Sequence, residues 1–223
     1  MERKAEAHTG IPPGHPVRPP GRDGRGSLTI GVLALQGDFA EHASALQQLG
    51  EATRLVRLPQ DLDGLDALIL PGGESTTIGK LAVTYGLIDA LRQFAARRAM
   101  WGTCAGAIFL SRDAGRDQPL LGLMDIRVER NAFGRQVDSF EAELPFPTLD
   151  QPERPFRCVF IRAPLIESVG EDVQVLARLP EPPGPGRGTI VAARQGRWLA
   201  TSFHPELTSD LRFHRWFAEM ARD

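Results

Sequence analysis

The sequence predicts an α/β fold of three layers, in which helices cover both faces of a mainly parallel central sheet. Strand-length apolar runs alternate with helical segments through the first half of the chain, which is typical of consecutive strand–helix–strand units. Several of these runs are apolar throughout, as expected for strands that are buried on both faces. After about residue 120 the pattern changes to short strands separated by turns. The second half therefore adds mixed or antiparallel strands to the sheet.

The first unit begins with the apolar run LTIGVLAL (28–35), which we interpret as a strand, and continues with the helical segment 38–50. Asp38 and Glu41 have the spacing of a capping box at the start of this helix. Gly50 is a residue type that commonly ends a helix. One apolar face of the helix is formed by Phe39, Ala43, Leu46 and Leu49.

The other elements follow in order along the chain. In the first half they are strands at 52–58 and 66–70, helical residues from about 75 to 97 with a break at Gly86, a strand at 99–103, and a helix that begins at Cys104. In the second half they are strands at 123–130, 139–144, 157–163, 173–179, 188–195 and 197–203, and a closing helix at 209–222. A parallel sheet between two helical layers is the flavodoxin-like arrangement.

Composition and charge exclude several classes of function. The 223 residues are 42% hydrophobic, which is enough for one sizeable core. The 26 basic residues nearly balance the 28 acidic ones, so the basic excess of a nucleic-acid-binding surface is missing. No apolar run reaches the roughly 18 residues that a membrane span needs. Cys104 and Cys158 match no metal-site spacing, so we expect no metal and a reducing, cytoplasmic location.

Residues 1–27 differ in composition from the rest of the chain. This stretch contains five prolines, five glycines and no aliphatic cluster that could form a core. It also lacks the apolar region of a secretory signal. We interpret it as a disordered extension, or as residues added by a start codon assigned too far upstream, and we expect the folded domain to span residues 28–223.

The segment WGTCAG (101–106) places a cysteine between two glycines where a strand turns directly into a helix. Gly102 and Gly106 would relieve the crowding at such a corner, an arrangement that presents a nucleophile at a strand end. At a helix N-terminus the thiol of Cys104 faces backbone N–H groups and the positive end of the helix dipole, which favour the reactive thiolate. A small buried cysteine beside packing glycines is the alternative interpretation.

A cysteine nucleophile needs a base, and His204 is the histidine best placed to supply it. It directly follows the strand 197–203, and Glu206 could hold one imidazole tautomer as the third member of a triad. A turn with a capping glutamate is the alternative. The other histidines lie in the extension (His8, His15) or are interpreted as solvated or packing residues (His42, His214).

The segment LILPGGESTTIGKL (68–81) ends a strand in Pro-Gly-Gly and then starts a helix. Adjacent glycines allow the backbone to approach a ligand and to turn its N–H groups toward it, as an oxyanion hole requires. Lys80 is compatible with a phosphate-binding loop, but the Walker spacing is absent. A plain tight turn is the other alternative.

In this order, the three elements resemble those of class I glutamine amidotransferases. Within that class, the chain is most similar to the glutaminase subunits of pyridoxal 5′-phosphate synthases. The segments that carry the resemblance span about residues 28–222 and are GVLALQGDFAEH (31–42), LPGGESTTI (70–78), GTCAG (102–106), VERNAFGRQVDSFEAEL (128–144), FIRAP (160–164) and SFHPELT (202–208). The extension 1–27 and the proline- and glycine-rich loop 179–189 lie outside the family pattern.

The resemblance implies a role for each site residue. Cys104 would attack the side-chain amide of L-glutamine, His204 would transfer the protons, and Glu206 would orient His204. The N–H groups of Gly73 and Ala105 would form the oxyanion hole. The residues implied to bind glutamine are Gly73, Glu74, Ser75, Arg130, Ile161 and Arg162, with Gln36 as a neighbour of the site. An arginine suits the α-carboxylate of glutamine, which a guanidinium can bind through two hydrogen bonds.

The resemblance also implies a partner, and no cofactor. Glutaminases of this family pass ammonia through an internal channel to a (β/α)8-barrel synthase subunit, in a large hetero-oligomer that makes pyridoxal 5′-phosphate (vitamin B6). Two alternatives are another cysteine hydrolase of related fold, such as a γ-glutamyl hydrolase or a peptidase-like protein, and a non-catalytic docking subunit. The late His-Pro-Glu and the RNAFGRQ segment oppose the first alternative, and the intact triad opposes the second.

Overall fold

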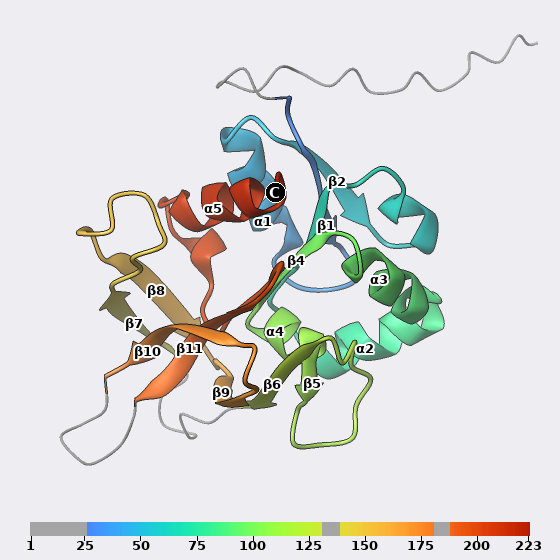
Figure 1. The fold of residues 1–223 in the computed structure, drawn as a ribbon. Helices are drawn as coiled ribbons and strands as arrows, with labels where there is room; N and C mark the ends of the chain where they lie inside the picture. Colours follow the sequence, from blue (N-terminus) through green and yellow to red (C-terminus); the bar gives the residue numbers. More distant parts are fainter. Residues whose placement is uncertain (1–25, 131–138, 181–187) are drawn as a thin grey trace, which may run out of the picture.

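The computed structural model describes residues 26–130, 139–180 and 188–223 (Figure 1). Most of the predicted extension, the middle of segment 128–144 and the centre of loop 179–189 lie outside the described residues. The elements of the first half are β1 (Thr29–Leu33), α1 (Phe39–Gln48), β2 (Ala52–Val56), a 3-10 turn at Pro59–Leu62, β3 (Ala67–Leu70), α2 (Ser75–Thr84), α3 (Leu87–Ala95), β4 (Ala99–Thr103) and α4 (Ala105–Leu110). Those of the second half are β5 (Ser111–Asp113), β6 (Met124–Glu129), β7 (Ser139–Leu144), β8 (Phe156–Ile161), β9 (Leu165–Val169), β10 (Gln174–Leu179), β11 (Thr189–Gln195), β12 (Trp198–Thr201), a 3-10 turn at Pro205–Leu207 and α5 (Arg212–Met220).

The central sheet has ten strands in the order β2-β1-β3-β4-β12-β11-β9-β6-β5, with β10 paired to β11. The five strands from β2 to β12 run parallel to one another. The strand β11 runs antiparallel to β12, β9 and β10, and β9 runs antiparallel to β6. A separate antiparallel hairpin consists of β7 and β8. The predicted parallel first half and mixed second half are therefore confirmed.

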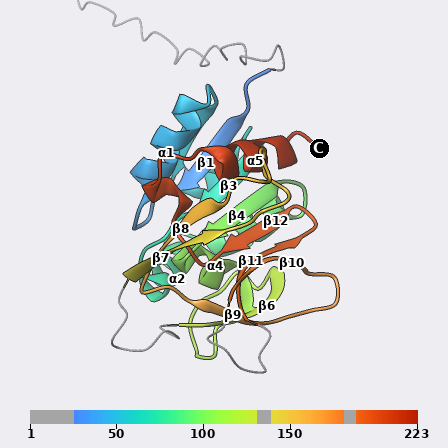
Figure 2. The same ribbon diagram turned by 90° about the vertical axis from the view of Figure 1, so that its left-hand side faces the viewer.

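Three layers arise because successive side chains of a strand point to opposite faces of the sheet. In β3, Leu68 and Leu70 pack in the core that α2, α3 and α4 cover. Ile69 belongs to the opposite core, which is closed by α1, α5 and the β7–β8 hairpin. Figures 1 and 2 show α1 and α5 together on one side of the sheet. The site described below lies at the carboxyl ends of the parallel strands, where such sheets commonly bind ligands.

The break in the second helical segment lies where the sequence predicts it. Gly86 separates α2 from α3 and has a left-handed backbone conformation, with φ at 67°. Glycine adopts this conformation without the steric penalty of a Cβ atom. The predicted cap of α1 is wrong, because Asp38 stands at the N-cap position but its side chain makes no capping hydrogen bond. That carboxylate faces His204 instead.

The sequence pattern does not predict β5 or β9. The strand β5 is only three residues long, which is too short to give a periodic signal. The strand β9 follows Pro164 and carries exposed Glu167 and Ser168, so its apolar pattern is interrupted. β5 is defined by its pairing with β6, and β9 by its pairing with β6 and β11, which are contacts that a local pattern does not reveal.

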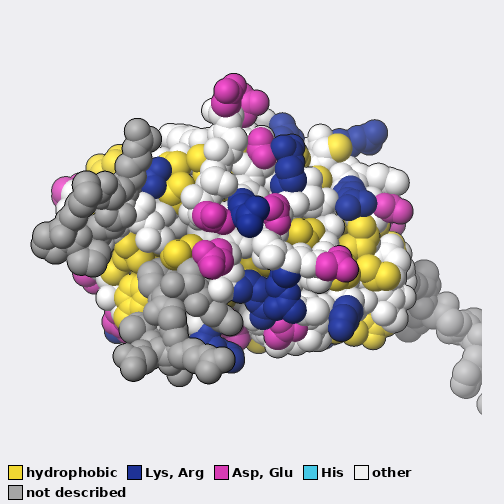
Figure 3. Space-filling view, turned by 90° about the horizontal axis from the view of Figure 1, so that it is seen from below, with side chains coloured by type: hydrophobic (Ala, Val, Ile, Leu, Met, Phe, Trp, Pro, Cys, Tyr) yellow, Lys and Arg dark blue, Asp and Glu magenta, His cyan; other side chains and the backbone are white. Residues whose placement is uncertain are grey.

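The end of the sheet formed by β9, β6 and β5 carries both acidic and basic side chains. On the face seen in Figure 3, basic and acidic side chains are interspersed. Ion pairs link β5, β6 and β9: Arg112–Asp125, Arg127–Asp113 and Arg127–Glu167. Charged side chains on edge strands discourage pairing with another sheet. In the part of the chain that the structure describes, no helix is both long enough and apolar enough to cross a bilayer.

Candidate active site

Cys104 occupies a sharp corner between β4 and α4. Its backbone has a positive φ of 46° with ψ at −106°, which is rare for a residue with a side chain and is typical of a nucleophile elbow. A Cβ atom at Gly102 would lie 2.5 Å from the carbonyl oxygen of Gly106, and one at Gly106 would overlap the carbonyl of Leu70. Both predicted glycines are therefore required by close backbone packing. The Cys104 N–H donates to the carbonyl oxygen of Thr201, at 2.8 Å, which ties the elbow to β12.

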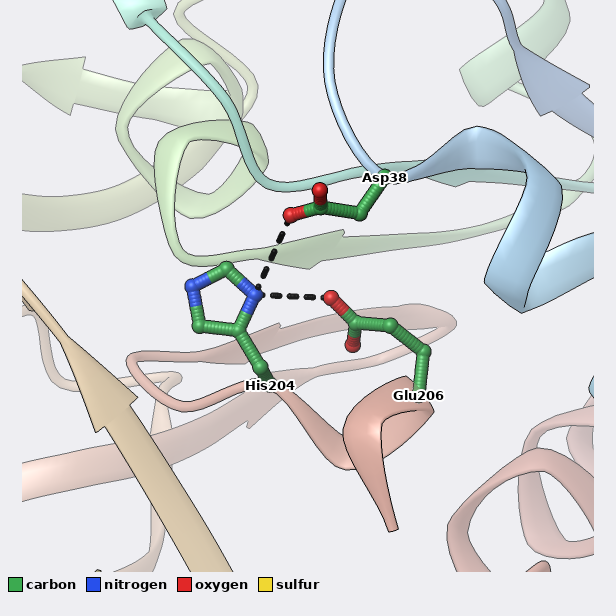
Figure 4. A group of neighbouring side chains, drawn as sticks. All are labelled: Asp38, His204 and Glu206. Atoms are coloured by element: carbon green, nitrogen blue, oxygen red, sulfur yellow. Dashed lines mark hydrogen bonds and ion pairs between the residues drawn. The ribbon is translucent and has the colours of Figure 1, made fainter.

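His204 and Glu206 meet beside this elbow, just after β12 (Figure 4). His204 Nδ1 lies 2.7 Å from Glu206 Oε1, and both side chains are buried. An ionised carboxylate can only accept, so Nδ1 carries the proton and donates it to Glu206. The remaining ring nitrogen, Nε2, is then the atom available to the thiol of Cys104. The predicted triad residues are thus brought together from two strand ends.

The electrostatics of the site favour a protonated His204. Burial lowers its pKa, but hydrogen bonding and charge interactions with Cys104 and Glu206 outweigh burial and raise the pKa to about 10. Burial raises the pKa of Glu206, although the interaction with His204 opposes that change. An imidazolium between a thiol and a carboxylate can stabilise negative charge on either neighbour.

A cavity of about 400 Å³ opens in front of Cys104 and His204. This volume lies within the range of small-molecule sites, roughly 300–1,000 Å³. Every residue that the sequence analysis assigns to the site lines the cavity except Glu206, which lies behind His204. These lining residues are Gln36, Gly73, Glu74, Ser75, Cys104, Ala105, Arg130, Ile161, Arg162 and His204. Residues that the sequence analysis does not assign but that also line it are Gly37, Asp38, Ile108, Pro164 and Leu207.

The Pro-Gly-Gly turn after β3 lies directly over the imidazole. A Cβ atom at Gly72 would overlap the ring of His204, so the loop could not pass so close with any larger residue. Gly73 has φ at 151°, and a Cβ atom there would lie 2.5 Å from Gln36 Oε1. The same Gln36 oxygen accepts a hydrogen bond from the N–H of Glu74, at 2.6 Å. Gln36 therefore fixes the loop that the sequence analysis predicts to hold the oxyanion hole.

The sequence profile of the SNO glutamine amidotransferase family matches residues 32–223. The chain belongs to this family. It is 56% identical over 195 residues to the pyridoxal 5′-phosphate synthase subunit PdxT of Herpetosiphon aurantiacus, covering 85% of this chain and 98% of that protein. It is 55% identical over 196 residues to the protein of the same name from Thermus thermophilus, covering 86% of this chain and 97% of that protein.

Solved structures agree with membership of the SNO amidotransferase family. A crystal structure of a glutamine amidotransferase is 52% identical to this chain, with a TM-score of 0.79, and the match covers 87% of this chain and 99% of the other. The structure of PurLQS from Thermotoga maritima is 15% identical with a TM-score of 0.65, covering 86% of this chain and 98% of the other, and shares the fold alone. These matches confirm the predicted fold class.

In this amidotransferase the side chain of Glu74 has a structural task that the sequence analysis does not predict. Its carboxylate caps α2 by accepting from the N–H groups of Thr76, at 3.2 Å, and Thr77, at 2.7 Å. Arg130 Nη2 donates to the same carboxylate at 2.8 Å, and Arg130 Nη1 donates to Thr76 Oγ1 at 3.0 Å. Glu74 thus fixes both the start of α2 and the Arg130 guanidinium at the cavity wall.

These contacts predict a pH-dependent contribution of Glu74 to stability. Burial raises the pKa of Glu74, but the hydrogen bonds from Thr77, Thr76 and Arg130 outweigh it and lower the pKa to about 2, from an unperturbed 4.5. A depressed pKa stabilises the folded state above pH 4.5, and this contribution is lost as the pH falls toward 2. We expect Glu74→Gln to lower the free energy of unfolding by about 1 kcal/mol near neutral pH, since the group is half exposed and is partly screened by solvent.

Urea unfolding of the wild type and of Glu74→Gln, measured from about pH 7 down to about pH 3, checks this prediction. The difference in unfolding free energy between the two proteins should shrink steadily as the pH falls below about 4.5. A difference that stays constant over this range would show that the ionised carboxylate does not supply the stabilisation.

Asp38, His204 and Glu206 form a compact group of oxygen and nitrogen atoms that all lie within 4.8 Å of one another (Figure 4). His204 Nδ1 is shared, since Glu206 lies 2.7 Å from it and Asp38 lies 3.5 Å from it. That nitrogen carries a proton for Glu206 and is not free to ligate a cation. We therefore interpret the group as the His204–Glu206 pair of the predicted triad, with Asp38 as an additional carboxylate at the cavity.

Two further histidines of the amidotransferase lie behind the triad. The interpretation of His42 and His214 as solvated is wrong, because both are fully buried. The alternative, that they are packing residues, is incomplete, because each makes a buried hydrogen bond. A signal for their burial is present in the sequence: His42 shares a helical face with Phe39, Ala43 and Leu46, and His214 lies one turn before Phe217 and Ala218.

Proposed function

We propose that this chain is the glutaminase subunit of a pyridoxal 5′-phosphate synthase, which hydrolyses L-glutamine to L-glutamate and ammonia. The observation that carries the proposal is the meeting of Cys104, His204 and Glu206 at one wall of a cavity of small-molecule size. Membership of the glutamine amidotransferase family supports the substrate, and relatives at 56% and 55% identity are named as subunits of that synthase.

The proposed reaction has two halves that use the same groups. The Cys104 thiolate attacks the amide carbon of glutamine, and the negative charge that develops on oxygen is stabilised by the N–H groups of Gly73 and Ala105. Ala105 is the first residue of α4, so its N–H has no partner within the helix. His204 then gives its proton to the leaving nitrogen, and ammonia departs from a glutamyl thioester. In the second half His204 takes a proton from water, which hydrolyses the thioester and restores the thiolate.

The substrate contacts that we propose follow from the cavity wall. The guanidinium groups of Arg130 and Arg162 provide donors for the α-carboxylate of glutamine. Arg162 has a left-handed backbone with φ at 43°, a strained conformation that is often found at functional sites. Ser75 is buried at the start of α2, and the side chain of Ile161 forms part of the rim. Glu74 acts by holding Arg130 in place.

We further propose that the ammonia passes to a (β/α)8-barrel synthase subunit docked over the cavity, within a large hetero-oligomer. Free ammonia is mostly protonated near neutral pH and is then no nucleophile, so an enclosed route preserves its reactivity. Ile161 and Leu207 line the cavity and are exposed apolar side chains, which is the surface that a docked partner would cover. Both cysteines are free thiols, in agreement with a reducing cytoplasm.

Ammonia release from L-glutamine, measured for this chain alone and with its cognate barrel synthase, tests the proposed function. We expect slow release by the chain alone and a rate at least tenfold higher in the complex. Equal and high rates in both cases would leave the glutaminase in place and remove the partner's role. No ammonia in either case would contradict the glutaminase proposal.

A further inference from the structure

The outer oxygen of the Glu206 carboxylate lies next to a second, fully buried histidine. His42 Nε2, from the middle of α1, lies 3.3 Å from Glu206 Oε2, and both side chains have no exposed area. The same nitrogen lies 3.2 Å from Thr103 Oγ1, at the end of β4 directly before Cys104. On the other side of the ring, His42 Nδ1 lies 2.9 Å from His214 Nε2, which comes from α5.

The positions of the protons in the series from His214 through His42 to Glu206 follow from the carboxylate at its end. An ionised carboxylate offers only acceptors, so His42 must carry its proton on Nε2. That N–H is within hydrogen-bond distance of Thr103 Oγ1, at 3.2 Å, and it faces Glu206 Oε2 at 3.3 Å in an electrostatic contact that does not reach hydrogen-bond geometry. His42 Nδ1 is then an acceptor, so the Nε2–H of His214 donates to it. His214 Nδ1 is left as a buried lone pair with no hydrogen-bond partner among the described residues.

Both histidines are suited to donate a hydrogen bond without adding a charge. Burial, followed by the influence of His214 and His204, keeps the pKa of His42 well below its usual value. Burial lowers the pKa of His214 to about 3. A neutral His42 can orient the Glu206 carboxylate and still leave its full negative charge for His204. A cation at this position would compete with His204 for that charge.

Contacts with Trp101 hold the rings of both histidines in place. Trp101 contacts both rings edge-on, with centroid distances of 5.7 Å to His42 and 5.1 Å to His214. Trp101 is itself fixed by a hydrogen bond from Nε1 to Thr201 Oγ1, at 3.1 Å. Glu206 Oε2 makes no hydrogen bond among the described residues, so the electrostatic contact with the His42 N–H, at 3.3 Å, helps to oppose protonation of this buried carboxylate.

We propose that His42 is a positioning residue for the glutaminase reaction: its neutral imidazole, oriented by His214, holds the Glu206 carboxylate ionised and aligned on His204. The inference rests on the proposed function only for the identity of the substrate. His42 is a buried donor behind the proposed triad. Its Nε2 lies near both Glu206, which contacts His204, and Thr103, which directly precedes Cys104. Loss of the hydrogen-bond partners that orient metal ligands typically costs 10- to 100-fold in activity, and we expect an effect of about that size for a residue that orients Glu206.

Three variants separate positioning from packing. His42→Leu keeps the approximate volume and removes the donor, whereas His42→Gln keeps a neutral N–H near the position of Nε2. Phe217→Leu is the control, since Phe217 packs against Trp101 in the same core but contacts neither Glu206 nor His42 through a hydrogen bond. Thermal unfolding identifies how much stability each variant loses.

The first readout is ammonia release by the complex with the barrel synthase. We expect His42→Leu to lower kcat about 10- to 100-fold with KM changed less than about threefold, and His42→Gln to recover at least about a third of the wild-type kcat. Phe217→Leu should keep kcat close to that of the wild type at a temperature where it is folded. Equal loss in His42→Leu and Phe217→Leu, or no loss in His42→Leu, would overturn the proposal.

The second readout is the pH dependence of Cys104 alkylation by iodoacetamide, which does not require glutamine to be the substrate. The ionisable groups that face one another around the triad are Cys104, His204, Glu206, Asp38, His42 and His214. Loss of the His42 donor makes Glu206 easier to protonate, and His204 then keeps its proton less well. We expect the midpoint of alkylation to move upward by about one pH unit in His42→Leu and to stay unchanged in Phe217→Leu.

The two readouts also separate this inference from the proposed function. If the wild type releases no ammonia but the alkylation midpoint moves as expected, the function is wrong and the positioning role of His42 stands. If the wild type releases ammonia and His42→Leu changes neither kcat nor the midpoint, the function stands and the inference is wrong.

Discussion

Replacing Cys104 with alanine is expected to abolish ammonia release from L-glutamine while the fold and the binding of the barrel synthase persist. In the proposed reaction the thiol forms the covalent bond to the substrate, and loss of such a nucleophile typically costs at least about 10³-fold in kcat. The fold should tolerate the change, because the side chain borders the cavity and alanine meets the positive φ at Cys104 with no larger penalty. Enzyme-coupled detection of ammonia and a binding assay with the synthase measure both parts.

Cys158 provides the matched control for this substitution. Its side chain is fully buried in β8, and burial followed by the nearby charge of Glu143 raises the pKa of its thiol. A thiol of this kind is inert as a nucleophile. Cys158→Ala should therefore lose some stability and keep kcat. A Cys104→Ala variant that releases ammonia at the wild-type rate would contradict the assignment of the nucleophile.

Replacing His204 with alanine is expected to lower kcat by at least about 10³-fold and to slow alkylation of Cys104 near pH 6.5 by roughly tenfold or more. At that pH the wild-type imidazole is protonated, because Cys104 and Glu206 raise its pKa to about 10 against the lowering effect of burial. In the proposed reaction the imidazolium stabilises the negative charge of the attacking sulfur and supplies the proton for the leaving nitrogen. Both functions disappear with the ring. Alkylation followed by mass spectrometry, and kcat in the presence of the synthase, measure the two effects.

The raised pKa of His204 also predicts how the stability of the folded protein depends on pH. A pKa raised from 6.5 to about 10 contributes stability that is fully present below pH 6.5 and is lost as the pH rises toward 10. The unfolding temperature of the wild type should therefore fall more steeply than that of His204→Ala across this range. Parallel curves for the two proteins would show that the imidazolium pair does not form.

Much of the fold could be predicted because its information is local. The β1, β3 and β4 strands are almost entirely apolar and alternate with helices that have clear ends, such as the break at Gly86. The strands β5 and β9 could not be predicted in the same way, because long-range pairing with β6 defines them. The cap of α1 failed for a different reason. Asp38 has the spacing of a cap, but the buried imidazole of His204 competes for its carboxylate.

The residues at the candidate site could be predicted where the chemistry requires a particular residue type at a particular spacing. The elbow glycines and the Pro-Gly-Gly turn are examples, since no side chain fits at these close approaches. The role of Glu74 as a helix cap and the contact between His42 and Glu206 could not be predicted. Each depends on atoms from elements far apart in the sequence. A lone histidine on an apolar helical face indicates burial, but it does not indicate which group the histidine contacts.

The most direct test of the account is the capture of the covalent intermediate. We would mix the complex of this chain and its barrel synthase with L-glutamine, quench in acid within one turnover, and measure the mass of the chain and of the peptide that contains Cys104. We expect an increase equal to one glutamyl group on Cys104, and none in Cys104→Ala. Ammonia release without such an adduct, or an adduct on Cys158 in place of Cys104, would contradict it.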